Sequence, residues 1–211
     1  MNTIKVKDDR NIVLCKVIMI TSNNPGEGKT FCSVNIGAIL AKAGKRVLII
    51  EMDLHKPRVH KALQLPSEEG SSSVLIGKTR FEEVIVKSSI ENLDAILSGP
   101  MPPNPSEILL NDSLDALLKE ARENYDYVII DTPPIGLITD ALVLMKHSDV
   151  NLFVLNTKVT NKNAVKKLED IVEKSQAKNV GLILNGVKRK RAGYYYKYYG
   201  YSYGYGSGKS Q

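Results

Sequence analysis

A glycine-rich loop lies between a short apolar run and a helical pattern near the start of the chain. The apolar residues Val17–Ile20 lead into Thr-Ser-Asn-Asn-Pro-Gly-Glu-Gly-Lys-Thr, which ends at Thr30. Gly26 and Gly28 let backbone N–H groups close around phosphate oxygens, and the following helix adds the positive end of its dipole. The Lys29 ammonium reaches the β- and γ-phosphates of a nucleotide, and the Thr30 hydroxyl is a ligand for Mg²⁺. Strand, loop and helix in this register predict a P-loop, with a chance glycine-rich turn as the alternative.

One position of this loop departs from the P-loop consensus. Asn23 stands where the consensus has glycine, and asparagine tolerates left-handed backbone angles better than most residues do. The loop residues predicted to bind the nucleotide are Pro25, Gly26, Glu27, Gly28, Lys29, Thr30 and Phe31.

Two further apolar runs end in carboxylates. Tyr127–Ile130 is followed by Asp131, and in P-loop folds an acid at this place holds a Mg²⁺-bound water. Val47–Ile50 is followed by Glu51 and then by Asp53, and this strand comes directly after the P-loop helix, beside the phosphates. A carboxylate there orders Mg²⁺ or accepts a proton from an attacking hydroxyl. A turn-forming or solvated acid is the alternative reading of each strand end.

The elements that must position these residues alternate along the chain. Short β-branched or leucine-rich runs, typical of buried parallel strands, are separated by helical patterns. The predicted strands are Lys16–Ile20, Val47–Ile50, Leu93–Leu97, Tyr127–Ile130, Val150–Leu155 and Val180–Leu184, and the predicted helices are Lys29–Ala43, Ser106–Glu123, Thr139–His147 and Asn163–Ser175. This alternation predicts an α/β fold, a mostly parallel central sheet with helices on both faces.

The last part of the chain has a different composition. Residues 188–191 are Lys, Arg, Lys and Arg, and eight of the last 18 residues are tyrosines with glycines between them. Glycines at this density disfavour regular structure. We therefore predict a folded domain over residues 1–187 and, over residues 188–211, a basic linker with a flexible tyrosine-rich tail. The basic run is typical of a segment that touches lipid or nucleic acid, with a solvated linker as the alternative.

Bulk properties narrow the class of protein. A length of 211 residues suits one α/β domain, and the net charge is +6. No apolar stretch approaches the roughly 18 residues that span a bilayer, and the N-terminus lacks the order of a signal peptide. A cytoplasmic location is therefore expected. Cys15 and Cys32 share no metal-ligand or redox spacing, so both are interpreted as reduced, structural thiols.

Taken in this order and spacing, the motifs resemble those of the bacterial tyrosine kinases of capsular and exopolysaccharide synthesis. The resemblance covers nearly the whole chain from Cys15. It is carried by Pro-Gly-Glu-Gly-Lys-Thr30, by Asp53 with Lys56-Pro57, by Pro102–Glu107, by Tyr125–Pro134, by Thr139–Ala141 and by the terminal tyrosine cluster.

The resemblance implies a P-loop NTPase that uses ATP and Mg²⁺. It implies that Asp53 serves the catalytic role together with Lys29 and Asp131. It also implies that Thr30, Asp53 and Asp131 hold the metal. Asn185, at the end of the last strand, matches an adenine-side position in related ATPases, and a turn residue is the alternative there.

The reaction implied is transfer of the γ-phosphoryl group of ATP to tyrosine hydroxyls of the tail, mainly between neighbouring copies. The implied partners are other copies of the chain, a membrane protein that regulates polysaccharide chain length, either fused or separate, and a tyrosine phosphatase. Nucleic acid is not expected as a partner. The membrane activator would hold the kinase at the inner face of the cell membrane. The implied phosphorylation sites are Tyr194, Tyr195, Tyr196, Tyr198, Tyr199, Tyr201, Tyr203 and Tyr205.

Two departures from the family pattern stand out. The second acidic strand usually reads Asp-x-Asp-x-Arg, whereas here it reads Glu51-Met-Asp53-Leu-His55, so one acid has a longer side chain. The Glu-x-x-Arg-x-x-Arg helix that builds the family's ring-shaped oligomer has no counterpart in Met1–Leu14.

Two other classes of function remain open. A nucleotide-switch ATPase of the Min or Par type is the main rival, but those ATPases carry a lysine where this chain has Asn24. The third class is an RNA-binding or self-associating protein driven by its tail, since tyrosine and arginine stack on bases. The basic block and the tyrosines are not interleaved as in such motifs, which favours the kinase.

Overall fold

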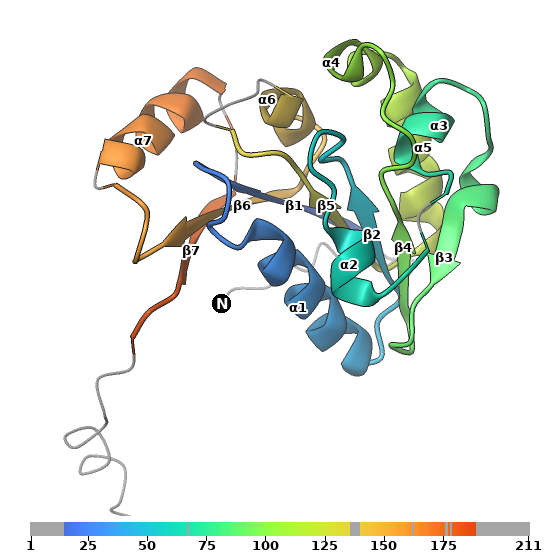
Figure 1. Cartoon of the computed structure of the whole chain (residues 1–211), viewed down its shortest axis with the longest axis horizontal. Helices are drawn as coiled ribbons and strands as arrows, with labels where there is room; N and C mark the ends of the chain where they lie inside the picture. The colour runs from blue at the N-terminus through green and yellow to red at the C-terminus, as the bar shows by residue number, and fades with distance from the viewer. Residues whose placement is uncertain are drawn as a thin grey trace, which may run out of the picture.

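The computed structural model shows an α/β fold in which one central sheet carries helices on both faces (Figure 1). It describes residues 15–188 except 67, 136–139, 162, 176 and 178. The predicted tyrosine tail with its phosphorylation sites, and residues 189–191 of the predicted linker, lie outside the described residues. The predicted domain boundary after residue 187 therefore stays a prediction.

Seven strands form the sheet, in the order β3-β4-β2-β5-β1-β6-β7. All neighbouring strands pair in parallel except β3, which is antiparallel to β4. The strands are β1 (Lys16–Ser22), β2 (Val47–Glu51), β3 (Ile85–Lys87), β4 (Leu93–Ile96), β5 (Tyr127–Asp131), β6 (Val150–Asn156) and β7 (Val180–Asn185). The six predicted strands and the mostly parallel sheet are confirmed. The seventh, β3, is missing from the prediction because three residues are too few to show a strand pattern.

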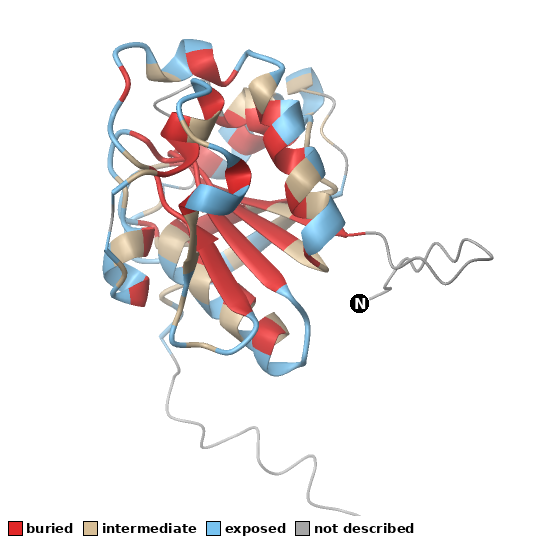
Figure 2. Ribbon diagram, turned by 90° about the vertical axis from the view of Figure 1, so that its right-hand side faces the viewer, coloured by how far each residue is buried: buried red, intermediate tan, exposed pale blue. Residues whose placement is uncertain are grey.

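Two apolar layers hold the sheet between its helices. Successive strand residues point to opposite faces, so Leu48 and Ile50 pack into one layer while Ile49 packs into the other. The first layer lies beneath α5, α6 and α7, and the second beneath α1 and α2; Figure 2 shows the buried strands between them. The helices are α1 (Lys29–Lys42), α2 (Val59–Leu63), α3 (Ser71–Leu75), the 3₁₀ helix η1 (Phe81–Val84), α4 (Pro105–Ile108), α5 (Ser113–Asn124), α6 (Asp140–Met145) and α7 (Asn163–Ser175). None of the helices in the described part of the chain has the length and apolar content to cross a membrane.

The single helix predicted over Ser106–Glu123 is wrong. The chain forms α4, then a turn, and then α5. Asn111 and Asp112 occupy the turn, and side chains of these types compete with the helix by bonding to nearby backbone groups. The Leu114 N–H donates to the Asn111 carbonyl at 3.1 Å, which starts α5 afresh. The short helices α2 and α3 are also missing from the prediction, because five residues do not complete an amphipathic period.

The two cysteines are buried free thiols, as the sequence predicts. Burial raises the pKa of the Cys15 thiol to about 11, although the nearby Arg122 guanidinium opposes the rise. Burial likewise raises the pKa of Cys32. Both side chains are therefore protonated, unreactive packing groups at neutral pH.

The P-loop helix α1 lies unusually close to the sheet at Gly37. A Cβ atom there would lie 3.1 Å from the Ile49 Cδ1 atom, 3.2 Å from the Leu93 Cδ1 atom and 3.4 Å from the Ile129 Cδ1 atom. These methyl groups come from three neighbouring strands, β2, β4 and β5. The absence of a side chain at Gly37 thus allows this short distance between α1 and the sheet. The same distance sets how far the P-loop, at the start of α1, lies from the strand ends.

We expect Gly37→Val to destabilise the fold, because the added carbons overpack a layer that has no room for them. The expected loss in the free energy of unfolding is about 1–3 kcal/mol, measured by urea titration. Asn35→Val, on the exposed face of the same helix, is the matched control for the poor helix propensity of valine. Equal losses in the two variants would contradict the close packing at Gly37.

Candidate functional site

The parallel strands bring their carboxyl ends to one edge of the sheet, and the predicted site residues gather there. β1 leads into the P-loop, β2 ends at Glu51, β5 ends at Asp131 and β7 ends at Asn185. The five strands β2, β5, β1, β6 and β7 are adjacent in that order. The edge therefore carries the acids on one side of the P-loop and Asn185 on the other.

The P-loop has the backbone conformation that a phosphate cradle needs. Gly26 and Gly28 have φ angles of 82° and 99°, in the left-handed region that side chains rarely adopt. A Cβ atom at Gly28 would also lie 2.2 Å from the Asn185 Nδ2 atom. Glycine at position 28 is therefore required both by its backbone angle and by the approach of β7.

The Glu27 side chain braces this loop from inside. It is fully buried; one carboxylate oxygen accepts the Asn24 N–H at 2.8 Å, and the other accepts the Thr160 hydroxyl at 2.6 Å. The Asn185 amide donates to the Glu27 carbonyl at 2.9 Å. As a result, Glu27 and Asn185 hold the loop in shape, and only the backbone N–H of Glu27 remains for phosphate binding.

Lys29 lies between two carboxylates at the start of α1. Its Nζ atom is 2.7 Å from the Asp53 Oδ2 atom and 3.9 Å from the Asp131 Oδ2 atom. The other oxygen of Asp53 accepts the Lys56 N–H at 3.0 Å, which closes the turn after β2. The structure thus brings the three residues predicted to be catalytic into one cluster.

Asp131 is held by two hydroxyls as well as by the lysine. Thr30 donates to its Oδ2 atom at 2.7 Å, and the Ser33 hydroxyl lies 2.9 Å from its Oδ1 atom. Complete burial raises the pKa of the Asp131 carboxyl, while Lys29 and the two hydroxyls oppose that rise. Ser33 is missing from the prediction, although its place one helical turn after Lys29 is a signal that could have found it.

The predicted metal ligands have the chemistry that Mg²⁺ requires. Thr30, Asp53 and Asp131 offer hard oxygen atoms within one cluster. In the part of the chain that the structure describes, no three His, Cys, Asp or Glu side chains are grouped to hold a metal ion. Two carboxylates with one hydroxyl suit Mg²⁺, which binds few protein ligands and completes its shell with water and phosphate oxygens.

Glu51, the first acid of the second strand, has a different role. It is fully buried; one of its oxygens accepts the N–H groups of Arg58 and Val59, and the other accepts the Ser98 N–H at 3.2 Å. Burial raises its pKa, and these three hydrogen bonds oppose the rise. Its lone pairs serve the backbone, so Glu51 anchors the loops that follow β2 and β4.

The remaining predicted ligands lie around this cluster. Pro25 and Gly26 are exposed at the tip of the P-loop, and Phe31 is 64% exposed on the outer side of α1. Thr160, which lies between the P-loop and β6, is missing from the prediction because no local pattern marks it.

Comparisons with known proteins place the chain among similar sequences. The family described as AAA domain matches residues 15–184. The chain is 40% identical over 183 residues to the tyrosine-protein kinase YwqD of Bacillus subtilis strain 168, covering 85% of this chain and 77% of YwqD. It is 36% identical over 182 residues to CapB of Staphylococcus aureus, covering 86% of this chain and 80% of CapB.

Solved structures show the same likeness. The chimerical protein CapA2B2 has a TM-score of 0.79 at 38% identity, covering 82% of this chain and 77% of that chain. The kinase domain of the Escherichia coli tyrosine kinase ETK has a TM-score of 0.79 at 34% identity, covering 90% of this chain and 72% of that one. The septum site-determining protein MinD from Pyrococcus horikoshii, complexed with Mg-ADP, has a TM-score of 0.67 at 24% identity, covering 81% of this chain and 70% of that one, and shares the fold.

We expect Glu51→Gln to lower the free energy of unfolding by about 1–3 kcal/mol at neutral pH. The amide keeps one acceptor but turns an NH₂ group toward a buried backbone N–H. Chemical denaturation measures the loss, with the exposed Glu82→Gln as control. A Glu51 variant as stable as the wild-type protein would refute the anchoring role.

Thr160→Val should weaken nucleotide binding by about tenfold, or ~1.4 kcal/mol, because it removes the hydroxyl that holds the P-loop glutamate. Isothermal titration with Mg-ADP gives the dissociation constant. The exposed Thr157→Val, in the same loop, should bind as the wild-type protein does. If the two variants bind Mg-ADP equally well, the hydrogen bond from Thr160 to Glu27 does not contribute to nucleotide binding.

Proposed function

The chain belongs to the bacterial tyrosine kinases of capsule and exopolysaccharide synthesis. From the geometry of its site we propose that Lys29 binds the phosphates of ATP and that Asp53 accepts the proton of the substrate tyrosine. It is a protein-tyrosine kinase with a P-loop nucleotide site. The observation that carries the assignment of roles is the position of Lys29, whose ammonium lies 2.7 Å from Asp53 and 3.9 Å from Asp131. A lysine in this place meets the phosphates of ATP with one acid on either side.

Binding of ATP is the first role of the cluster. The N–H groups of the P-loop and the Lys29 ammonium bind the phosphates and neutralise their charge, which is most of what phosphoryl transfer needs. Thr30 and Asp131 lie on the side where Mg²⁺ would be held. When bound, Mg²⁺ supplies further charge neutralisation at the β- and γ-phosphates.

Asp53 is the residue that we assign to proton transfer. Its carboxylate accepts the proton of the tyrosine hydroxyl as that oxygen bonds to the γ-phosphorus atom. The bond between the γ-phosphorus atom and the bridging oxygen breaks, and ADP leaves. Both acids are buried and accept a hydrogen bond on each oxygen, but their partners differ. Asp131 is held by the Thr30 and Ser33 hydroxyls of α1, whereas the Asp53 Oδ2 atom is held by the Lys29 ammonium, which turns to the phosphates when ATP binds. Asp53 is therefore the better suited of the two.

The substrate that we assign is the chain's own tyrosine tail, phosphorylated mainly between copies. Eight residues, among them the basic run 188–191, separate the end of β7 at Asn185 from the first of the eight tyrosines from Tyr194 to Tyr205. Tyr125, by contrast, is buried, and its hydroxyl donates to the Asp94 carboxylate at 2.8 Å. Burial raises the pKa of Tyr125, so this tyrosine is a packing residue and not a phosphorylation site.

The proposed partners follow from the family. We infer that a CapA-type membrane protein activates the kinase and keeps it at the inner face of the membrane. The similar structure of the chimerical protein CapA2B2 supports such a partner. A tyrosine phosphatase would reverse the modification, and other copies of the chain would exchange phosphate with it.

An ATPase switch of the Min type is the second candidate, since the fold is shared with MinD. Asn24 argues against it, because this position carries a lysine in those ATPases. Phosphate release without protein labelling would favour the switch.

The full chain incubated with Mg-ATP should gain mass in steps of one phosphate, and peptide mapping should place the phosphates within Tyr194–Tyr205. Lys29→Met should abolish labelling, and Asp53→Asn should slow it by about 10²-fold or more, because charge neutralisation and general base catalysis are lost. The exposed Lys61→Met and Asp170→Asn are matched controls that should label normally. Unchanged labelling by Lys29→Met would overturn the proposed site.

A further inference from the structure

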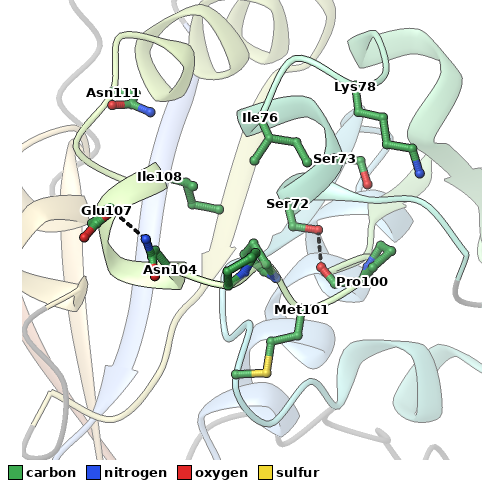
Figure 3. Close-up of a pocket in the computed structure, with 12 residues that line it drawn as sticks. Ser72, Ser73, Ile76, Lys78, Pro100, Met101, Asn104, Glu107, Ile108 and Asn111 are labelled. Atoms are coloured by element: carbon green, nitrogen blue, oxygen red, sulfur yellow. Dashed lines mark hydrogen bonds between the residues drawn. The ribbon is translucent and has the colours of Figure 1, made fainter.

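An open apolar groove lies beside α3, between this helix and the segment that leads from β4 to α4. Its volume is about 480 Å³, within the range of small-molecule and peptide pockets. Figure 3 shows Ile76, directly after α3, and Ile108, on α4, on opposite sides of the groove. The walls also carry Pro100, Met101, Pro102 and Pro103. Ile76 is 54% exposed and Met101 59% exposed, so apolar surface in the groove faces solvent.

The groove is already formed in the free chain. The Ser72 hydroxyl donates to the Pro100 carbonyl at 2.7 Å, and the Ser72 N–H donates to the Ser98 carbonyl at 3.0 Å. A Cβ atom at Gly70 would lie 2.1 Å from the Leu97 carbonyl oxygen, which shows how closely the two walls pack. Three prolines add further stiffness. A rigid groove binds without the entropy cost of ordering its walls.

The groove is anchored to the strand that carries the catalytic acid. Ser98 donates its N–H to the Glu51 carboxylate at 3.2 Å, and the Ser71 hydroxyl donates to the Glu51 carbonyl at 2.7 Å. Glu51 precedes Asp53 by two residues, and β2 and β4 are neighbours in the sheet, about 4.8 Å apart. The walls of the groove are therefore bonded to the strand that ends two residues before Asp53.

The chemistry of the groove suits tyrosine. Proline, isoleucine and methionine form its walls, and methionine sulfur makes favourable contacts with aromatic rings. Its rim carries polar groups, among them Asn104, whose amide donates to the Glu107 carboxylate at 2.9 Å, and Asn111. A tyrosine has an apolar ring and a polar tip, and therefore meets both parts of such a groove.

We propose that this groove is a docking site for the tyrosine-rich segment Ala192–Gly208 of the chain, presented by a neighbouring copy. This inference rests on the proposed function, since it names where that substrate binds. Eight of the ten tyrosines of the chain lie in this segment. One tyrosine docked in the groove holds the next ones over Asp53 for phosphate transfer.

The point where the tail leaves the domain agrees with this assignment. Lys188 follows β7, whose carboxyl end lies at the same edge of the sheet as the groove. Five strand spacings separate β7 from β4, roughly 24 Å. The ten Cα–Cα steps from Lys188 to Tyr198 span up to about 35 Å when extended. This exceeds the distance across the chain's own sheet edge, so the tail is long enough to reach the groove of an adjoining copy.

Phosphorylation changes the fit. A phosphotyrosine carries about −1.5 to −2 charges at neutral pH, and burying it against apolar walls is costly. Glu107 lines the groove, and Lys78, which also lines it, is already paired with the Glu69 carboxylate. The groove therefore binds unmodified tyrosines and releases phosphotyrosines. Each release leaves the groove free for the next tyrosine of the same tail.

The test uses the full chain as enzyme and a synthetic Ala192–Gly208 peptide as substrate. In Met101→Glu and Ile76→Glu, the KM for the peptide should rise by about tenfold or more, because a buried charge opposes the ring. The KM for Mg-ATP should not move. Val159→Glu, 63% exposed and outside the groove, should leave both values unchanged. A peptide phosphorylated on its tyrosines should compete at least about tenfold less well than the unmodified one.

A direct readout separates failure of this inference from failure of the kinase assignment. A photo-reactive phenylalanine derivative at the Tyr198 position of the peptide should cross-link to the groove, whether or not the enzyme transfers phosphate. Wild-type labelling of the peptide with an unchanged KM in both groove variants would overturn the docking site and leave the kinase standing. A change in particle mass on sedimentation, without a change in the KM for the peptide, would mean that a second copy covers the groove and would likewise overturn it.

Discussion

The position of one ammonium group between two buried carboxylates is the constraint on which the rest of the structure depends. Lys29 can stand there only because β1, β2 and β5 are parallel neighbours that end together. The helix that carries Lys29 packs closely against the sheet at Gly37. Asp131 ends β5, and Asp53 follows the end of the adjacent strand β2. The order of the strands, their lengths and the distance between α1 and the sheet together set the position of the Lys29 ammonium. A shift of any of these would leave a lysine or an aspartate buried without its partner, which is costly.

Four acids at this edge are buried, yet they divide into two groups. Glu27 accepts hydrogen bonds from the Asn24 N–H and the Thr160 hydroxyl. Glu51 accepts them from the backbone N–H groups of Arg58, Val59 and Ser98. Asp53 and Asp131 meet the ammonium of Lys29 and the hydroxyls next to it. The first group fixes loops. The second can exchange its lysine and hydroxyl partners for substrate and metal, although Asp53 also accepts the Lys56 N–H. All four acids are buried, so burial does not separate their roles. The hydrogen-bond partners do: they distinguish the structural acids from the acids assigned to catalysis and metal binding.

Short-range patterns in the sequence were enough for the six main strands, for the P-loop and for the cluster of Lys29, Asp53 and Asp131. They failed where tertiary contacts decide. The break between α4 and α5, the edge strand β3 and the role of Glu51 all depend on groups far away in the chain: Ser98, for example, lies 47 residues from the carboxylate it bonds. Thr160 and Ser33 look like ordinary helix or loop residues until the sheet brings Glu27 and Asp131 to them. The apolar groove is likewise invisible in the sequence, since its walls come from two separate segments.

The contact between Asn185 and the P-loop has a consequence for how such a chain can vary. Asn185 is three residues from Lys188, and its amide holds the Glu27 carbonyl while its bulk excludes any side chain at position 28. The root of the tail is thus fastened to the nucleotide loop by a single side chain. Changes in the chain beyond that root leave this contact in place, because they do not move Asn185. The attachment point itself is not free, because moving it by even one residue would unfasten the loop that holds the phosphates.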